Sequence, residues 1–235
     1  MSTRREAVAF DTHHFEKMAS RGEGSSVEAI FRDIYRRNHW GGTASRSGPG
    51  AALDQTTVLR QTLPGLLRHF AVETVLDLPC GDYSWMQLVD LPVASYIGAD
   101  LLPDLIQPLQ GRYADSRRRF VVLDLLVDEL PHADLLFCRD CLVHLSFVDI
   151  RRAVANLLRA DIPYLLTTTF PVTEQNEDIV TGDWRPLNLE RPPFNLPAPA
   201  AVLNENCTEA GGVFADKSLG LWRTAELRDL PFFAP

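Results

Sequence analysis

Three aspartates stand at the ends of three successive apolar segments, and their side chains suit the recognition of a nucleotide's sugar. Asp77 ends the first segment, Asp100 ends the second 23 residues later, and Asp124 ends the third. A carboxylate can accept hydrogen bonds from two neighbouring hydroxyl groups at once. In nucleotide-binding folds an acid about 20 residues beyond a glycine loop bonds the ribose in this way. Asp100 fits that position.

The loop after the first segment reads LPCGDYSWM, and its glycine content indicates which nucleotide it suits. A dinucleotide brings a pyrophosphate, which needs several glycines so that backbone N–H groups can approach it. Here Pro79, which has no N–H, and Tyr83 replace the first and third glycines, and Gly81 alone remains. S-adenosylmethionine (SAM) has no phosphate, and Asp77 and Asp82 suit its sulfonium and ammonium but would repel a pyrophosphate. The loop favours SAM over NAD(P).

The segment CRDCLVHLSF follows the fourth apolar segment and brings Arg139, Asp140 and His144 close to the expected position of the methyl group. Methyl transfer requires an aligned acceptor and, for a hydroxyl or a protonated amine, removal of a proton. A histidine has a suitable ordinary pKa, and a residue four positions earlier can share its helical face. We therefore hypothesise an Asp140–His144 base. The alternatives are a buried structural histidine and a metal-ligand pair, but no third ligand has clear spacing, so we expect no metal.

Alternating strands and helices position these residues. Apolar runs predict strands at ETVLDLP, SYIGADL, RRFVVLDLL, ADLLFCRD, IPYLLTTTF, AAVLNEN and SLGLWRTAEL. Helices are expected at 27–37, 55–69, 84–91, 103–115 with an interruption at Pro108, and 146–160. Continuous apolar strands separated by helices indicate a parallel sheet that is covered on both faces. We predict a doubly wound, Rossmann-like α/β fold with a seven-stranded, mostly parallel sheet, in which ligands bind at the carboxyl ends of the strands.

Two segments lie outside this alternation. Residues 1–50 are polar and rich in Gly and Ser near their end, and we expect a helical and loop segment that acts as a lid, with Trp40 and Arg46 over the cofactor; a disordered linker is the alternative. The main domain would span residues 51–235. Its insert at about 171–200 is long, polar and proline-rich, and long ordered loops are usually functional.

We expect this insert to build the acceptor pocket, although it could also be a rigid loop that packs Phe194 on the core. The candidate acceptor-binding residues are Tyr83, Thr169, Asn176, Asp178, Asp183, Trp184, Arg185, Asn188 and Glu205. Tyr83 is expected to face the pocket and Trp85 to pack behind the loop.

Composition limits the classes of function. The chain has 235 residues and a formal net charge of −8, which disfavours nucleic-acid binding because that requires clustered Lys and Arg. No apolar run approaches the ~18 residues of a membrane span, and the N-terminus lacks a secretory signal. Cys138 and Cys141 form a C-x-x-C pair without a second pair, so we interpret them as buried thiols. We expect a soluble, cytoplasmic protein that is a monomer or a homodimer.

The motifs VLDLPCGD, YIGADLL and FVVLDLL resemble, one by one, the first three motifs of class I SAM-dependent methyltransferases, and the resemblance covers about residues 75–170. It implies that Gly81 lies against SAM, that Asp100 holds the ribose, and that Asp124 with Leu125 reads the adenine edge. The implied cofactor-binding set is Asp77, Pro79, Gly81, Asp82, Asp100, Leu101, Asp124, Leu125 and Arg139. Pro79 and Tyr83 depart from the family's loop.

A narrower likeness rests on SGPG, DLPCGDYSWM, CRDCLVHLS and TGDWRPLNLERPPFNLP, which together resemble a bacterial branch of that family over about residues 31–222. The sequence therefore predicts a SAM-dependent methyltransferase acting on an oxygen or nitrogen of a small polar metabolite of the amine, guanidinium or sugar type. One alternative is an NAD(P)-binding oxidoreductase. Another is a non-catalytic binding subunit with a SAM fold.

Overall fold

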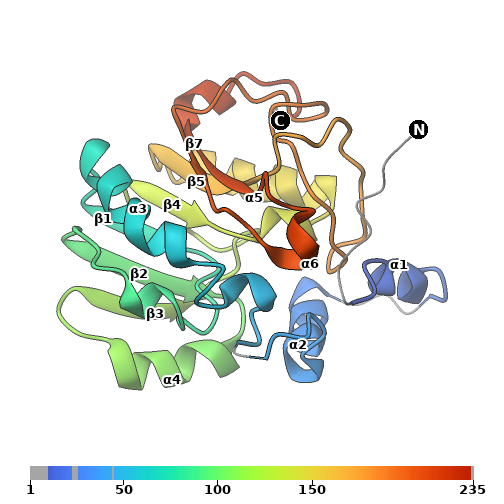
Figure 1. The fold of residues 1–235 in the computed structure, drawn as a ribbon, viewed down its shortest axis with the longest axis horizontal. Helices are drawn as coiled ribbons and strands as arrows, with labels where there is room; N and C mark the ends of the chain where they lie inside the picture. The colour runs from blue at the N-terminus through green and yellow to red at the C-terminus, as the bar shows by residue number, and fades with distance from the viewer. Residues whose placement is uncertain (1–9, 23–25, 44, 234–235) are drawn as a thin grey trace.

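The structure is a computed structural model, and it describes residues 10–22, 26–43 and 45–233. Its centre is a seven-stranded sheet with the strand order β3-β2-β1-β4-β5-β7-β6 (Figure 1). The strands are β1 (Thr74–Asp77), β2 (Ser95–Asp100), β3 (Arg118–Val122), β4 (Leu135–Cys138), β5 (Tyr164–Thr169), β6 (Ala201–Asn204) and β7 (Ser218–Arg223). Strands β1 to β5 pair in parallel, and β7 is antiparallel to both β5 and β6. The predicted mostly parallel, seven-stranded sheet is confirmed.

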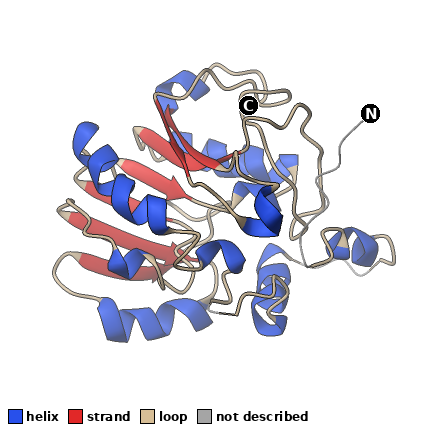
Figure 2. Ribbon diagram, in the orientation of Figure 1, coloured by secondary structure: helices blue, strands red, loops and turns tan. Residues whose placement is uncertain are grey.

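Helices cover both faces of this sheet (Figure 2). The α-helices are α1 (His14–Ala19), α2 (Val27–Arg37), α3 (Thr57–His69), α4 (Pro103–Tyr113), α5 (Phe147–Arg159) and α6 (Glu209–Gly212). The 3-10 turns are η1 (Pro49–Ala51), η2 (Met86–Leu88), η3 (Leu142–His144) and η4 (Thr224–Leu227). No helix among these described elements is both long and apolar enough to cross a bilayer.

The alternation of strand side chains divides the core into two halves. Leu76 and Leu136 face α5 and the insert, whereas their neighbours Val75 and Leu135 face α3 and α4. Such two-sided burial explains the apolar runs of the central strands β1 and β4. It leaves the carboxyl ends of β1, β2 and β4 as the place where polar side chains can gather.

Two predicted helices differ in the structure. Residues 84–91 form only the 3-10 turn η2, because Tyr83 before it has a left-handed backbone (φ 60°) and Leu91 precedes a proline, which disfavours helical geometry. Helix α4, in contrast, runs through Pro108 without interruption. The proline removes one backbone hydrogen bond, but the buried side chains of Ile106 and Leu109 hold the helix against the sheet.

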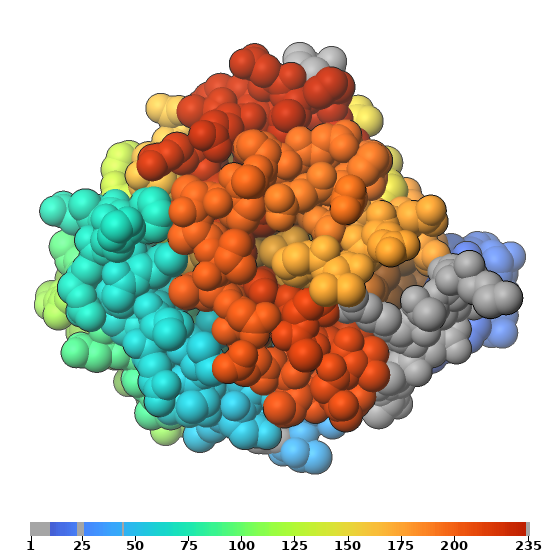
Figure 3. Space-filling model, turned by 45° about the horizontal axis from the view of Figure 1, so that its top comes forward, coloured from blue at the N-terminus to red at the C-terminus, as the bar shows by residue number. Residues whose placement is uncertain are grey.

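The segment after β6 crosses the molecule and lies against the segment before α3, as the orange and cyan surfaces in Figure 3 show. The Gln55 side-chain amide donates to the Thr208 hydroxyl oxygen over 2.7 Å, and the Thr208 N–H donates back to the side-chain oxygen Oε1 of Gln55 over 3.1 Å. The segment just before α3 therefore contacts residues 207–217 beside the edge of the sheet where the parallel strands end.

Candidate active site

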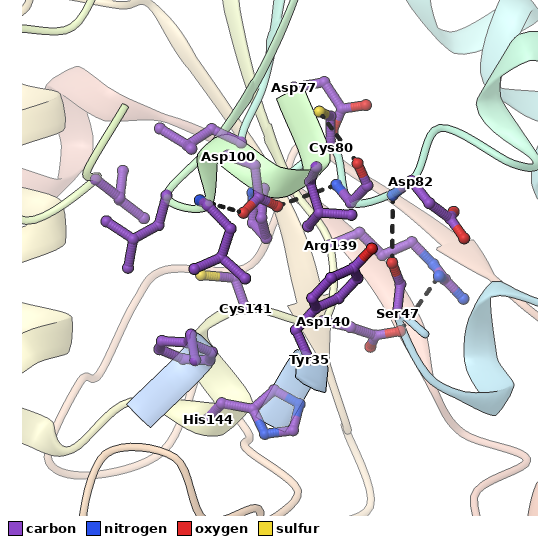
Figure 4. Close-up of a pocket in the computed structure, with 18 of the residues that line it drawn as sticks. Tyr35, Ser47, Asp77, Cys80, Asp82, Asp100, Arg139, Asp140, Cys141 and His144 are labelled. Carbon is purple, nitrogen blue, oxygen red and sulfur yellow. Dashed lines mark hydrogen bonds and ion pairs between the residues drawn. The ribbon is translucent and has the colours of Figure 1, made fainter. Parts of the chain in front are cut away.

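The carboxyl ends of β1, β2 and β4 surround a cavity, here called the first cavity (Figure 4). It lies between β1 and β4, where the strand order reverses, which is where open α/β sheets bind ligands. Its space is about 1160 Å³ when counted to the open mouth. The whole implied cofactor set lines it, namely Asp77, Pro79, Gly81, Asp82, Asp100, Leu101, Asp124, Leu125 and Arg139. Their role in binding stays a prediction.

Gly81 occupies a position that only glycine suits. Its backbone is left-handed (φ 56°), and a Cβ atom there would lie 2.4 Å from the Ser47 hydroxyl oxygen. The Gly81 N–H donates to the Asp100 carboxylate over 3.2 Å, and the next N–H, of Asp82, donates to the Ser47 hydroxyl over 3.4 Å. The one remaining glycine thus lets the loop bend toward the second strand's acid and approach the N-terminal segment closely.

Tyr83 does not face the first cavity, contrary to the expectation, whereas Trp85 packs on the core as expected, with its ring 6.1 Å from that of Phe137, and in addition reaches the cavity. Tyr83 is buried behind the loop, where its ring contacts Tyr96 and Phe120 at centroid distances of 5.4 and 5.0 Å, so it does not reach the first cavity. Trp85 lines the cavity, and the Arg139 guanidinium lies 5.5 Å from the centre of its ring. The left-handed backbone at residue 83 turns the tyrosine away and the tryptophan toward the site.

Two buried carboxyl groups form the floor of the first cavity. Asp100 accepts the N–H groups of Leu102 and Gly81, and burial raises the pKa of Asp100 to about 6. Asp77 shares a short 2.5 Å hydrogen bond with the Tyr96 hydroxyl, and burial raises the pKa of Asp77 to about 8. A cationic ligand would restore the charged form of both carboxyl groups because an opposite charge favours ionisation.

The charged side chains that line the first cavity also favour a cationic ligand. The carboxyl groups that line the first cavity belong to Asp77, Asp82, Asp100, Asp124 and Asp140, and the guanidinium groups belong to Arg46 and Arg139. Arg139 is already engaged, since its guanidinium donates two hydrogen bonds to Glu205 (2.7 and 3.1 Å) and one to the Gly50 carbonyl (2.9 Å). The cavity therefore suits a cation and disfavours a pyrophosphate.

We expect Asp77→Asn to be more stable than wild type at alkaline pH. The folded protein keeps the Asp77 proton up to about pH 8, whereas a free carboxyl with a pKa of 3.8 releases it. This contribution to stability is therefore complete below pH ~4 and is lost as the pH rises toward the folded pKa. Melting curves at pH 6.0 and 8.5 should show a variant advantage that grows with pH, to at least a few degrees. The exposed Asp104→Asn is the control. If the melting temperatures of wild type and both variants depend equally on pH, the raised pKa of Asp77 is contradicted.

The N-terminal segment covers the first cavity. Helix α2 begins at the Ser26 cap, whose hydroxyl accepts the Ala29 N–H over 3.2 Å, and ends at Asn38 in the left-handed region. Its inner face and the loop after it line the cavity through Val27, Phe31, Ile34, Tyr35, Trp40, Arg46 and Ser47. Trp40 and Arg46 thus lie where the lid hypothesis requires, and opening of this segment stays a prediction.

A second cavity adjoins the first, and the two share the side chains of Trp40, Ser47, Asp140 and His144. Its other walls are Phe10, Gly48, Pro49, Gly50, Phe170, Trp184, Cys207, Glu209, Phe214 and Lys217. A ligand in the second cavity would meet a ligand in the first beside these shared residues. Such a pair of joined cavities suits a reaction between two bound molecules.

His144 lies in the shared wall with one defined ring form. Its Nδ1 lies 3.0 Å from the Asp183 carbonyl oxygen, which can only accept, so Nδ1 carries the hydrogen and Nε2 has a free lone pair. The ring stacks on Trp40 at 4.5 Å, and burial lowers the pKa of His144 to about 4. The imidazole is therefore neutral at physiological pH, with Nε2 unprotonated, although the low pKa makes it a weaker base than an ordinary histidine.

The predicted Asp140–His144 pair does not form. Asp140 has a left-handed backbone (φ 52°), which breaks the helical spacing on which the pairing depended. Its carboxylate bonds instead to the Lys217 ammonium over 2.7 Å and lies 3.2 Å from the Arg139 guanidinium. These two cations hold the pKa of Asp140 well below its usual range, despite burial. Asp140 therefore remains ionised and is not a partner that orients the histidine.

The insert contributes far less to the cavities than predicted. Among its described residues only Trp184 lines either cavity, and the other candidates bond to backbone groups. Asn176 and Asn188 hold the turns of the insert, Asp178 accepts the first N–H of α5, and Asp183 accepts two N–H groups of α1. Thr169 is buried at the end of β5, and Glu205 is bound to Arg139.

The insert instead fixes the position of His144. Asp183 holds the ring through its carbonyl, and the Gly182 N–H donates to the His144 carbonyl over 2.8 Å. The Arg185 guanidinium donates to the carbonyls of Leu142 and Leu145, on either side of the histidine, over 2.8 and 2.6 Å. The Gly182 N–H and the Arg185 guanidinium thus bond to carbonyl groups of the short turn η3 and of the residue that follows it.

Cys138 and Cys141 are free thiols, and the hydrogen bond that the Cys141 thiol donates to Cys138, together with burial, raises the pKa of Cys141. A group of potential metal ligands in the described chain comprises His13, Glu16 and Asp183, whose ligand atoms lie within 4.8 Å of one another. Both Asp183 oxygens accept backbone N–H groups of α1. The capping of α1 is therefore a sufficient reason for this arrangement.

Comparison with known proteins identifies the fold. No family model matches the chain, and no curated protein matches its sequence. Among solved structures, human N-acetylserotonin methyltransferase in complex with SAM matches with a TM-score of 0.57 and 14% identity over 93% of this chain. The fold is that of a class I SAM-dependent methyltransferase. The match spans 63% of the length of the human protein.

Two other methyltransferases of similar size match over most of their own length. The N-methyltransferase NodS from Bradyrhizobium japonicum, in complex with S-adenosylhomocysteine (SAH), matches with a TM-score of 0.53 and 15% identity over 84% of this chain and 97% of its own. The methyltransferase domain of bacterial CtHen1-CN matches with a TM-score of 0.53 and 14% identity over 72% and 99%. At these identities the likeness establishes the methyltransferase fold alone.

Proposed function

We propose that the protein is a SAM-dependent methyltransferase that acts on an oxygen or nitrogen of a small molecule. The observation that carries this proposal is the excess of carboxyl groups around a loop that keeps only Gly81, at the carboxyl ends of β1 and β2. A sulfonium and an ammonium gain from these charges, whereas a pyrophosphate would be repelled. The methyltransferase fold and the adjoining second cavity support the same function.

The residues of the first cavity fit SAM in position and chemistry. Asp100 would accept the ribose hydroxyls, and Asp77 and Asp82 would neutralise the cationic part. Asp124 and Leu125 would bind the adenine edge, and their loop is held by Asn156 of α5, whose amide donates to the carbonyls of Leu125 and Asp128, each over 2.8 Å. Trp85 and Trp40 would exclude water from the cofactor.

When bound, SAM would supply an electrophilic methyl group: the acceptor's lone pair would form the new bond to carbon as the carbon–sulfur bond breaks, and the electron pair of that bond would stay on the sulfur of SAH. His144 would take the proton that the acceptor's O–H or N–H releases, because the residue lines both cavities and its Nε2 is the unprotonated ring nitrogen. Asp183 keeps Nε2 in the unprotonated form by accepting the Nδ1 hydrogen. Trp40 fixes the ring plane by stacking.

The proposal is tested by incubating the protein with methyl-tritiated SAM and a deproteinised bacterial extract. We expect the label to enter an extractable small molecule while SAH accumulates in equal amount. Protein that binds SAM but forms no SAH above a protein-free control would instead indicate a non-catalytic binding subunit.

A further inference from the structure

The second cavity has a wall of aromatic rings that contact one another edge to face. The ring of Trp184 lies 6.2 Å from that of Phe170 and 5.1 Å from that of Phe214, with interplanar angles of 89° and 75°. Trp40 lies on another side of the cavity, against His144. Aromatic rings favour stacked and edge-to-face contacts with a further ring, and their faces also attract cations. This lining suits a flat, unsaturated body better than a sugar.

The charged groups beside these rings are not balanced. Two cations, Arg139 and Lys217, are grouped with three carboxylates, Asp140, Glu205 and Glu209. Arg139 pairs with Glu205 at 2.7 Å and Lys217 pairs with Asp140 at 2.7 Å. Glu209 is left with Lys217 at 3.9 Å as its closest cation among the described residues. The excess charge of the group is therefore negative, and Glu209, whose other polar contact is the Cys207 thiol at 3.7 Å, is the carboxylate with the weakest cation pairing.

Two of the three carboxylates are more exposed than either cation, whereas Glu205 is buried with Arg139. The side chains of Glu209 and Asp140 are 23% and 27% exposed, whereas those of the two cations are 7% or less. The atoms Lys217 Nζ, Asp140 Oδ2 and Glu209 Oε1 converge on Gly50, where a Cβ atom would lie 3.0–3.1 Å from each of them. The absence of a side chain at Gly50 leaves these carboxylates open to the cavity.

We propose that the second cavity binds an aromatic amine, whose ring lies among Phe170, Trp184 and Phe214 and whose ammonium group bonds to the Glu209 carboxylate. This inference rests on the proposed function only in taking that ligand to be the methyl acceptor. Of the amine, guanidinium and sugar acceptors that the sequence predicted, the inference selects the amine. It further specifies that the amine carries an aromatic ring. It also places recognition on the segment 207–217 rather than on the insert.

Calorimetry on the SAH-saturated protein tests this with three probes of similar size. The probes are 2-phenylethylamine, 2-cyclohexylethylamine, which lacks the aromatic ring, and 3-phenylpropionate, which reverses the charge. We expect 2-phenylethylamine to bind about 10-fold more tightly than either of the others, from ring contacts and one charged hydrogen bond. Equal binding of the three probes, tighter binding of the propionate, or no binding of any probe overturns the proposal.

The variant Glu209→Gln removes the negative charge of this side chain and keeps its shape, so it tests the contribution of the charge to amine binding. Glu209 does not line the first cavity, so the variant should bind SAH as wild type does, which also shows that it is folded. Its affinity for 2-phenylethylamine should fall about 10-fold, while the exposed Glu226→Gln should change nothing. Unchanged amine affinity in Glu209→Gln refutes the role of Glu209. Failure of wild type to bind SAH would instead count against the proposed function, and the probes can then be titrated without SAH.

Discussion

Replacing Asp100 with alanine should weaken SAH binding by about 100-fold or more. The carboxylate ends β2 at the floor of the first cavity and is the acceptor that we propose for the two ribose hydroxyls. Each hydrogen bond to a charged group contributes about 1.5–3 kcal/mol, so the loss of two corresponds to at least about two orders of magnitude in affinity. Isothermal titration of SAH measures this directly.

Two further variants separate ribose binding from loop structure. Asp100 also accepts the N–H groups of Gly81 and Leu102, so alanine removes support for the loop as well. Asp100→Asn keeps one carbonyl oxygen and should give an intermediate affinity, and the exposed Asp104→Ala should bind SAH normally. If Asp100→Ala is folded and binds SAH within about 3-fold of wild type, the assignment of the ribose site is wrong.

Replacing His144 with asparagine should lower kcat by about 100-fold at saturating SAM, because proton transfer by a positioned base contributes at least that much. Asparagine can still donate to the Asp183 carbonyl in place of Nδ1, but it has no group in place of Nε2. A purely structural histidine would therefore tolerate this change, whereas a base would not. The assay uses the acceptor found by the SAH-release experiment, and the exposed His69→Asn is the matched control.

The pH profile gives an independent test of the same residue. With a pKa of about 4, His144 is unprotonated across the neutral range, so wild-type kcat should not fall until the pH approaches that value. Near-wild-type turnover of His144→Asn, with unchanged SAH affinity, would show that the histidine is structural and that another group takes the proton.

The cofactor side of the site could be predicted from the sequence because its residues follow the strands directly. Asp77 and Asp100 are the last residues of β1 and β2, and Arg139 follows β4 at once. Parallel strands bring their carboxyl ends together, so order along the chain was enough to place these residues at one edge. The sheet was also predictable, because its central strands are continuous apolar runs in the sequence.

The acceptor side could not be predicted because it is built by contacts between distant segments. Lys217 and Glu209 come after the sheet is almost complete, and they reach the site only because residues 207–217 fold against η1 and the loop before it. No local pattern around either residue signals this. The sequence analysis instead assigned acceptor binding to the polar residues of the insert. Asn and Asp side chains, however, commonly bond to nearby backbone groups in turns, so their presence does not indicate a binding site.

Local backbone conformation accounts for the remaining differences. Left-handed geometry at Tyr83 and Asp140, at φ 60° and 52°, redirects the side chains that follow and breaks the i, i+4 relation assumed for His144. Such conformations are uncommon for residues with a side chain. They occur here in the two loops after β1 and β4 that line the first cavity.

The central claim is that the first cavity binds SAM and not a dinucleotide, and parallel calorimetric titrations of wild-type protein with SAH and NAD⁺ test it most directly. The account predicts saturable SAH binding, with a Kd in the micromolar range or below, and no detectable heat from NAD⁺. Tight NAD⁺ binding without SAH binding would contradict it and would favour an oxidoreductase.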